Sequence, residues 1–330
     1  MSLVRFAGRR ALQGIGVVWG VITIVFALRF ITPGSVIGAV APLDADQETR
    51  DAIAADLGLN EPLYAQYLNY IADLLQGDMG FSYVKSQEVT RLVFSKLPAT
   101  VELAVTATIL AVVLSIPLGV ISATRRNQPA DYGATLFSLF GISTPNFWLG
   151  IIMIIVLAVQ FGIFKTSGRV VGFPDVVASV LGPRPFLDTL QTWLAYITLP
   201  TISLGTYFTA LVTRLTRSGM LDELGKSYVQ ASRAKGLPET LVRYKHALRN
   251  TLAPIVTVLG LQLGTLIGGA VITEAVFSWP GLGTLLIDSI NLRDWPVLQG
   301  CLVVIGVSFV IVNIVVDTLY GYLDPQAVNE

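Results

Sequence analysis

Six stretches of this chain are long enough and apolar enough to cross the hydrocarbon core of a bilayer. A core about 30 Å thick requires roughly 20 residues of helix. The stretches cover residues 11–31, 101–123, 132–164, 193–213, 251–276 and 298–320. The sequence therefore predicts an all-α integral membrane protein with six transmembrane helices, forming a single domain over residues 1–330.

The composition favours burial in lipid over burial in a soluble core. Hydrophobic residues make up 53% of the chain and charged residues only 13%, whereas soluble domains carry about a quarter charged residues. Basic and acidic residues are balanced at 22 each, which gives no indication of a nucleic-acid partner. With one cysteine, Cys301, and one histidine, His246, the sequence predicts neither an intrachain disulfide nor a metal site.

The third stretch is interrupted at Ser143-Thr144-Pro145-Asn146. Proline removes a backbone donor and clashes with the preceding helical turn. Membrane bundles tolerate such breaks where neighbouring groups satisfy the freed carbonyls. We expect one span over residues 132–164 that is broken or kinked near Pro145.

Positive residues alternate between the two sides of the predicted bundle. They precede the first span at Arg9 and Arg10, follow the second at Arg125 and Arg126, and crowd the loop 214–250 after the fourth. Basic residues in short loops favour the cytoplasm. We therefore expect a multi-pass protein of the plasma membrane with both termini cytoplasmic.

The first apolar stretch has an alternative interpretation as a cleaved signal peptide, because Ala39-Val40-Ala41 resembles a cleavage site. The apolar part of a signal peptide spans about 7–15 residues. Here it approaches the length of a full span, which favours an uncleaved first helix. Residues 33–98 then form a small extracytoplasmic insertion, with short helices near 46–57 and 64–75 that are separated at Gly58.

Motifs for common catalytic sites are missing from the sequence. It contains no G-x-x-x-x-G-K-[ST] loop for ATP, no H-E-x-x-H and no C-x-x-C. We therefore expect that this chain is not an enzyme and carries no cofactor or metal. Any energy for its function must come from a partner or from an ion gradient.

The loop 214–250 has features of an ordered structure. Its segment 226–235 is rich in residues that favour helix, and Gly236 suits the left-handed residue that ends one. Pro238 suits the first turn of a following helix. Two short helices are therefore predicted to meet at a fixed corner, although a basic loop that only anchors the topology remains an alternative.

The same loop resembles the cytoplasmic signature of ABC importer membrane subunits, which reads Glu-Ala-Ala, three residues, then glycine. Here the pattern falls on Gln230, Ala231, Ser232 and Gly236, with the glutamate and the second alanine replaced. The peptide-importer branch of that family departs from the signature at the same place. Further segments similar to that branch are 57–60, 77–80, 143–150, 246–250, 268–274, 277–283 and 320–325.

The resemblance implies a permease subunit that forms half of a translocation pathway with a second homologous permease subunit. It also implies two cytoplasmic ABC ATPase subunits that bind ATP and Mg, and an extracytoplasmic protein that delivers peptides. The residues implied in ATPase coupling are Gln230, Ala231, Ser232, Arg233, Ala234, Lys235, Gly236, Leu237 and Pro238. Importers of nickel, glutathione or oligosaccharides within the same family remain alternatives, as does a secondary transporter driven by an ion gradient.

Three residues near the ends of spans are candidates for the pathway or a gate: Glu274, Trp279 and Asp317. A charge within the hydrocarbon is expensive, so an acidic residue in a span usually faces protein or water. The alternative for Glu274 and Asp317 is a structural polar contact. Trp279, which follows Glu274 in Trp279-Pro280-Gly281, is expected to shape the outer mouth.

Overall fold

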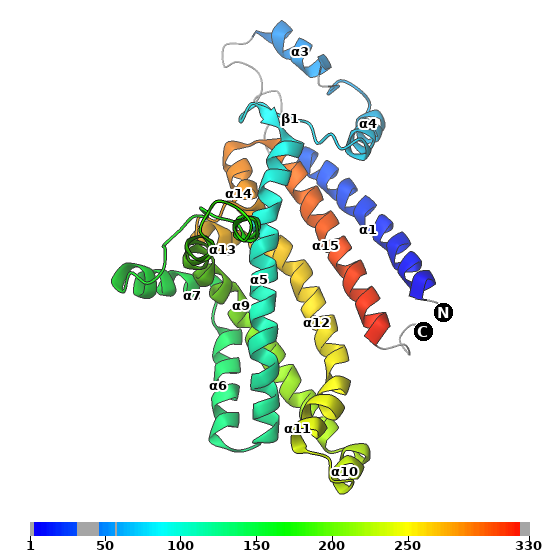
Figure 1. Cartoon of the computed structure of the whole chain (residues 1–330). Coiled ribbons are helices and arrows are strands. Elements are labelled where there is room, and N and C mark those ends of the chain that lie inside the picture. Colours follow the sequence, from blue (N-terminus) through cyan, green and yellow to red (C-terminus); the bar gives the residue numbers. More distant parts are fainter. Residues whose placement is uncertain (1–2, 32–45, 57, 324–330) are drawn as a thin grey trace.

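The computed structural model describes residues 3–31, 46–56 and 58–323, and this part of the chain is helical apart from one small hairpin (Figure 1). The first half contains α1 (Leu3–Ile31), α3 (Gln47–Asp56), α4 (Leu63–Leu75), β1 (Phe81–Ser82), β2 (Gln87–Glu88), α5 (Val89–Thr124), α6 (Pro129–Ser143), α7 (Asn146–Met153) and the π-helix η1 (Ile154–Gln160). The second half contains α8 (Phe173–Ser179), α9 (Phe186–Leu224), α10 (Ser227–Ala234), α11 (Glu239–Leu241), the π-helix η2 (Val242–Ala247), α12 (Leu248–Gly269), α13 (Val271–Val276), α14 (Leu282–Leu292) and α15 (Trp295–Leu323).

Four of these helices are long and apolar enough to cross a membrane, namely α1, α5, α9 and α15. Two bent pairs of helices raise the number to six if each pair is one span. The predicted all-α membrane class is therefore confirmed. The short helices α3 and α4 lie at one end of the bundle, here called the insertion end, and α10 lies at the other, here called the loop end (Figure 1).

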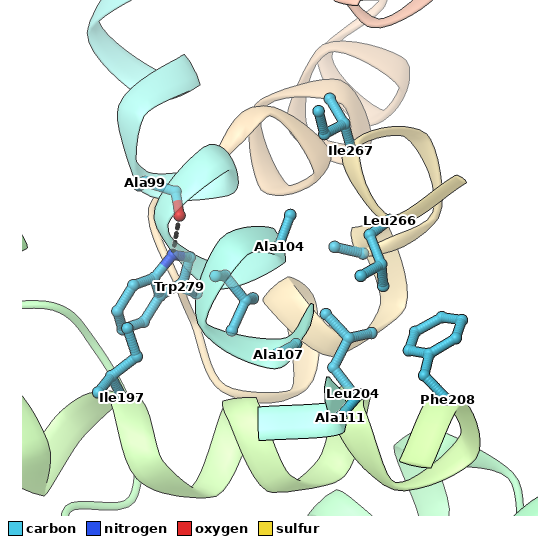
Figure 2. Close-up of a cluster of buried hydrophobic side chains, with 12 residues drawn as sticks. Ala99, Ala104, Ala107, Ala111, Ile197, Leu204, Phe208, Leu266, Ile267 and Trp279 are labelled. Atoms are coloured by element: carbon cyan, nitrogen blue, oxygen red, sulfur yellow. Dashed lines mark hydrogen bonds between the residues drawn. The ribbon is translucent and has the colours of Figure 1, made fainter. Parts of the chain in front are cut away.

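The centre of the bundle is the contact between α5 and α9. Small residues on α5, including Ala104, Ala107 and Ala111, face Leu204 and Phe208 of α9 in the cluster of Figure 2. Lipid supplies little hydrophobic force between helices, so close backbone approach is the main source of association. Small side chains at this contact permit that approach.

The third predicted span, residues 132–164, is broken near Pro145, which is one of the two forms expected there. α6 and the continuous α7–η1 segment meet at an angle of 103°. Thr144 and Pro145 both adopt extended backbone angles between them. The residue before a proline is disfavoured in helical geometry, so two successive residues leave the helix and the chain turns sharply.

Other predicted spans differ from the structure in their limits. The second is the C-terminal part of α5, which begins at Val89, and the fourth is the central part of α9, which extends from Phe186 to Leu224. The predicted insertion 33–98 therefore ends nearer residue 88. The fifth is divided at Ala270, where α12 gives way to α13.

The insertion end is fastened to the first helix through α4. The hydroxyls of Thr23 on α1 and Tyr67 on α4 are 2.6 Å apart, and the rings of Phe26 and Tyr67 pack edge to face. The predicted helix break at Gly58 is present, with a positive φ of 63°. Residues 33–45 of the predicted insertion lie outside the described residues.

Candidate functional site

The corner predicted in the loop 214–250 is formed by α10, Gly236 and α11 at the loop end (Figure 1). α10 covers Ser227–Ala234, close to the predicted helix 226–235, and α11 begins at Glu239 directly after Pro238. Gly236 has a φ of 73°. This left-handed angle costs glycine little and other residues more, so the corner requires glycine for its backbone angle.

One side of α10 holds it against the bundle. Val229 is fully buried, and the Tyr228 hydroxyl donates to Glu223 of α9 at 2.6 Å while accepting from Asn250 of α12 at 2.9 Å. Burial raises the pKa of Tyr228, and the bond to Glu223 raises it further. The phenol therefore stays neutral and can donate at neutral pH, which links α9, α10 and α12.

The opposite side of α10 is exposed and carries small side chains. Gln230, Ala231 and Ala234 are exposed there, within one helical turn of each other. Arg233 pairs with Glu239 at 2.7 Å, which braces α10 against α11. The result is a helix fastened on one side that presents Gln230, Ala231 and Ala234 away from the bundle.

Glu274 is fully buried, and its carboxylate accepts three hydrogen bonds. The donors are the Thr100 hydroxyl at 2.6 Å and the backbone N–H groups of Gly283 at 2.8 Å and Thr284 at 3.1 Å. Thr100 in turn accepts from the N–H of Leu282 at 2.7 Å. The first N–H groups of α14, which no helical carbonyl can satisfy, are thereby capped by residues of α5 and α13.

Two glycines make room for this carboxylate. A Cβ atom on Gly281 would lie 2.3 Å from Glu274 Oε1, and a Cβ on Gly283 would lie 2.5 Å from the backbone of Val271. The geometry matches the structural alternative considered for Glu274. Its role in a pathway or gate stays a prediction.

Trp279 and Asp317 also make contacts within the bundle. The Trp279 side chain is fully buried, and its indole N–H donates to the Ala99 carbonyl of α5 at 2.8 Å. Asp317 of α15 pairs with Arg10 of α1 at 3.3 Å, with both side chains partly exposed. Trp279 joins the turn between α13 and α14 to α5, and Asp317 joins α15 to α1. The role of each at a gate stays a prediction.

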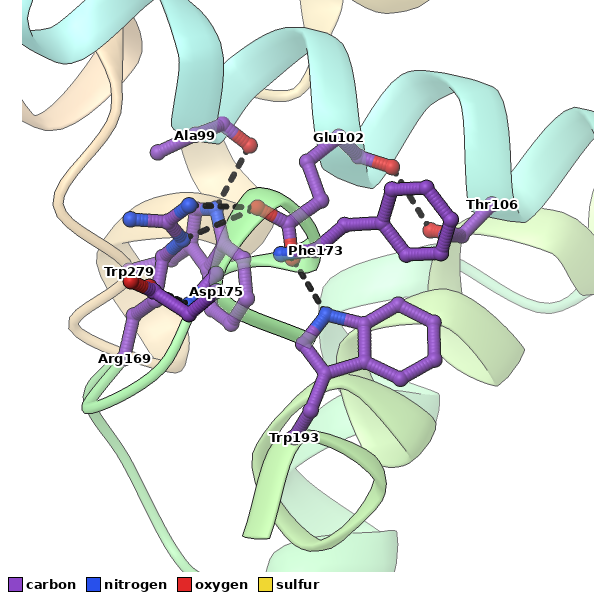
Figure 3. A network of polar contacts seen from close by, with 9 residues as sticks. Ala99, Glu102, Thr106, Arg169, Phe173, Asp175, Trp193 and Trp279 are labelled. Atoms are coloured by element: carbon purple, nitrogen blue, oxygen red, sulfur yellow. Dashed lines mark hydrogen bonds and ion pairs between the residues drawn. The ribbon is translucent and has the colours of Figure 1, made fainter. Parts of the chain in front are cut away.

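A polar network at Glu102, near the start of the second span, was missed by the sequence reasoning (Figure 3). The Glu102 carboxylate accepts from Arg169 Nε at 3.0 Å, from the backbone N–H of Phe173 at 3.1 Å and from the Trp193 indole. The guanidinium of Arg169 also lies 5.9 Å from the centre of the Trp279 ring. An acidic residue inside an apolar stretch was the available signal.

The Glu102 network fastens the segment between η1 and α8 to α5 and α9. Replacing Glu102 with glutamine should lower the midpoint of thermal unfolding of the purified protein, because Arg169 loses its charged partner. Breaking a buried pair from one side costs about 3–5 kcal/mol, and partial exposure of Arg169 reduces this to about 2 kcal/mol. The matched control is Arg184→Gln, which removes an exposed arginine after α8. An equal midpoint in both variants would show that the network adds no stability.

A second buried ion pair joins α6 to α9 near the loop end. Asp131 accepts from Arg217 Nε at 2.6 Å and from Arg217 Nη2 at 2.9 Å. The Ser122 hydroxyl and the Asn127 backbone N–H also donate to Asp131, at 2.6 Å and 2.9 Å. Asp131 therefore ties the α5–α6 turn to α9.

The helical bundle and the ordered corner define a multi-pass membrane protein. Residues 115–329 match the family described as "Binding-protein-dependent transport system inner membrane component", and residues 3–104 match its N-terminal companion, "Binding-prot-dependent transport system membrane comp, N-term". The chain belongs to this family of transport-system membrane components.

Curated relatives extend over nearly the whole chain. The oligopeptide transport system permease protein AppB of Bacillus subtilis is 39% identical, over 96% of this chain and 97% of the relative. The dipeptide transport system permease protein DppB of Escherichia coli K12 is 38% identical, over 93% and 94%. The glutathione transport system permease protein GsiC of Escherichia coli O6:H1 is 35% identical, over 98% of each.

A solved structure shares the fold. The inward-facing MetNI methionine ABC transporter matches with a TM-score of 0.51 and 17% identity, over 71% of this chain and 96% of the matched chain. At this identity the likeness concerns the fold alone.

Proposed function

We propose that this chain is a permease subunit of an ATP-driven importer and forms half of a pathway for peptides. The support for peptides is the full-length similarity to permeases named for oligopeptides and dipeptides. The relative named for glutathione transport fits the same substrate class, since glutathione is itself a tripeptide.

The observation that carries the proposal is the corner at Gly236. An exposed helix held at a fixed angle has no evident use in a loop that only anchors topology. In an importer, α10 serves as the coupling helix that docks into an ATPase subunit. Its exposed small residues, Ala231 and Ala234, allow close approach to a groove on that partner.

The proposal fixes the orientation of the protein. The loop end, with α10 and the basic loop 214–250, faces the cytoplasm, and the insertion end faces outward. Both chain termini are then cytoplasmic. α3 and α4 lie on the side where a binding protein would deliver its ligand.

The assembly requires four kinds of partner: a second homologous permease, two ABC ATPases, an extracytoplasmic binding protein and the lipid bilayer. The ATPase subunits hold ATP and Mg, because this chain contains no phosphate-binding loop. Closure of the ATPases would move the two permease halves through their coupling helices.

The test is to purify the chain from its native membrane, identify what copurifies, and measure ATP hydrolysis in reconstituted vesicles. We expect ATPase subunits to copurify, and we expect a peptide-loaded binding protein to stimulate hydrolysis. The chain purified without those subunits should hydrolyse no ATP. Transport driven by an ion gradient in the absence of ATPase subunits would refute the proposal, and stimulation only by a nickel- or sugar-loaded binding protein would refute its substrate class.

A further inference from the structure

A cavity of about 340 Å³ lies between α6 and α9 toward the loop end, apart from α10 and from the Glu274 and Glu102 networks. Its lining includes four hydroxyl side chains, among them Ser138 on α6 and Thr213 on α9, and two guanidinium groups, Arg214 and Arg217. None of these side chains belongs to the coupling site proposed above. The cavity therefore requires an explanation of its own.

The hydroxyls of Ser138 and Thr213 are buried without a hydrogen-bond partner. Ser138 is 4% exposed and Thr213 is 1% exposed, and within the described part of the chain no group bonds to either side-chain oxygen. Buried helical hydroxyls commonly donate to the preceding turn, as Thr209 does to the Gly205 carbonyl at 2.8 Å. Leaving a buried hydroxyl unsatisfied is destabilising. Of the five such hydroxyls in the described residues, these two line one cavity, where a ligand with acceptor oxygens would satisfy both.

The charges around the cavity favour an anion. Asp131 neutralises Arg217. The Asp131 oxygens also accept hydrogen bonds from Ser122 and Asn127, so they are occupied by protein donors. Arg214 is exposed and forms no ion pair with any residue that the structure describes. The net charge of these three ionised groups is positive, and the planar fork of an arginine suits phosphate oxygens.

The apolar part of the lining distinguishes a lipid from a free anion. Leu139 and Ile142 of α6 also line the cavity, and Leu139 is 64% exposed. α6 leads away from the loop end (Figure 1). Arg217 bonds to Asp131 in the first turn of α6, and Leu139 and Ile142 follow at least two turns later, so they lie deeper in the predicted membrane than Arg217. Basic groups thus lie nearer the membrane surface and apolar groups nearer its centre. This order matches a phospholipid, which has its phosphate at the surface and its acyl chains toward the centre.

We propose that this cavity binds an anionic phospholipid of the leaflet at the loop end. Arg214 and the free edge of Arg217 hold the phosphate, Ser138 and Thr213 donate to phosphate or ester oxygens, and one acyl chain lies along Leu139 and Ile142. Basic pockets between membrane helices are known sites for anionic headgroups. Because the Asp131–Arg217 pair joins α9 to the α5–α6 turn, the bound lipid would also brace the helix that leads into α10.

The test measures lipids retained by the purified complex in nanodiscs, by native mass spectrometry, with phosphatidylglycerol and phosphatidylcholine as probes. We expect the wild type to retain phosphatidylglycerol in preference to phosphatidylcholine. Arg214→Gln should lower that retention about tenfold, because the phosphate loses a charge-assisted hydrogen bond. Ser138→Ala and Thr213→Val should each lower it several-fold, because each removes one donor and keeps most of the packing.

Two matched controls separate the cavity from general effects. Thr216→Val removes another buried, unpartnered hydroxyl of α9 that does not line the cavity. Arg126→Gln removes an exposed arginine near the loop end, also outside the cavity. Both variants should retain phosphatidylglycerol as the wild type does.

Several outcomes would overturn the proposal. Equal retention of phosphatidylglycerol and phosphatidylcholine by the wild type would overturn it. This comparison needs no variant, so it remains decisive if a variant fails to fold. Wild-type retention in Arg214→Gln and Ser138→Ala would place the lipid elsewhere. Displacement of phosphatidylglycerol by millimolar inorganic phosphate would identify a site for a free anion in place of a lipid.

Discussion

Gly236→Val is expected to abolish transport while leaving insertion and pairing with the second permease intact. Gly236 has a φ of 73°, where a β-branched residue is a rare outlier. A Cβ atom at this position meets no heavy atom within 4 Å, so the cost comes from the backbone angle and not from a clash. Strain of about 1–3 kcal/mol is too small to unfold a bundle of long helices but is enough to move α10 relative to α11.

A graded series of variants tests this explanation. Asparagine tolerates a positive φ better than alanine, and alanine tolerates it better than valine. Transport should therefore decrease from the wild type to Gly236→Asn, then Gly236→Ala, then Gly236→Val. Gly225→Ala is the matched control, because Gly225 precedes α10 with an ordinary φ of −80° and its Cβ would have normal contacts. Transport, stimulation of ATP hydrolysis and ATPase copurification should be measured on the same preparations.

Larger side chains at Ala231 and Ala234 should have effects similar to those of Gly236→Val, because they would separate α10 from an ATPase groove. If Gly236→Val retains wild-type values in all three measurements, the loop is only a topological anchor, and the importer proposal loses its central support.

Glu274→Ala is expected to reduce the yield of folded protein severely. The variant leaves the Thr100 hydroxyl and two backbone N–H groups of α14 without their acceptor in a fully buried site. Each unsatisfied buried group costs about 1–3 kcal/mol, and the cavity adds to this. A total of at least about 3 kcal/mol is a large fraction of the stability of a typical domain. Yield of monodisperse protein and its thermal midpoint are the measurements.

Glu274→Gln separates the structural role from a pathway role. One amide oxygen can still accept from Gly283 and Thr284, while the amide N–H₂ can donate to Thr100 in place of the reverse bond. Yield should therefore fall less than in the alanine variant. Asp288→Ala, which removes an exposed acid of α14, should leave yield unchanged. Lost transport at wild-type yield in Glu274→Gln would instead favour a pathway contact.

The sequence alone determined the membrane class and the position of the corner at the loop end. The reason is that both depend on local properties. Span length follows from runs of apolar residues, and the end of α10 follows from the backbone freedom of Gly236 and the fixed φ of Pro238. The break near Pro145 was also located, although its 103° angle was not.

Only the tertiary structure decided which polar residues meet. Glu102 finds Arg169 and Trp193 far along the chain, and Glu274 caps α14 together with Thr100 of α5. Such contacts depend on how helices cross, which a pattern along one helix does not encode. Polar groups in an apolar medium need partners, and those of Glu102, Asp131 and Glu274 come from other segments that only the folded bundle brings together.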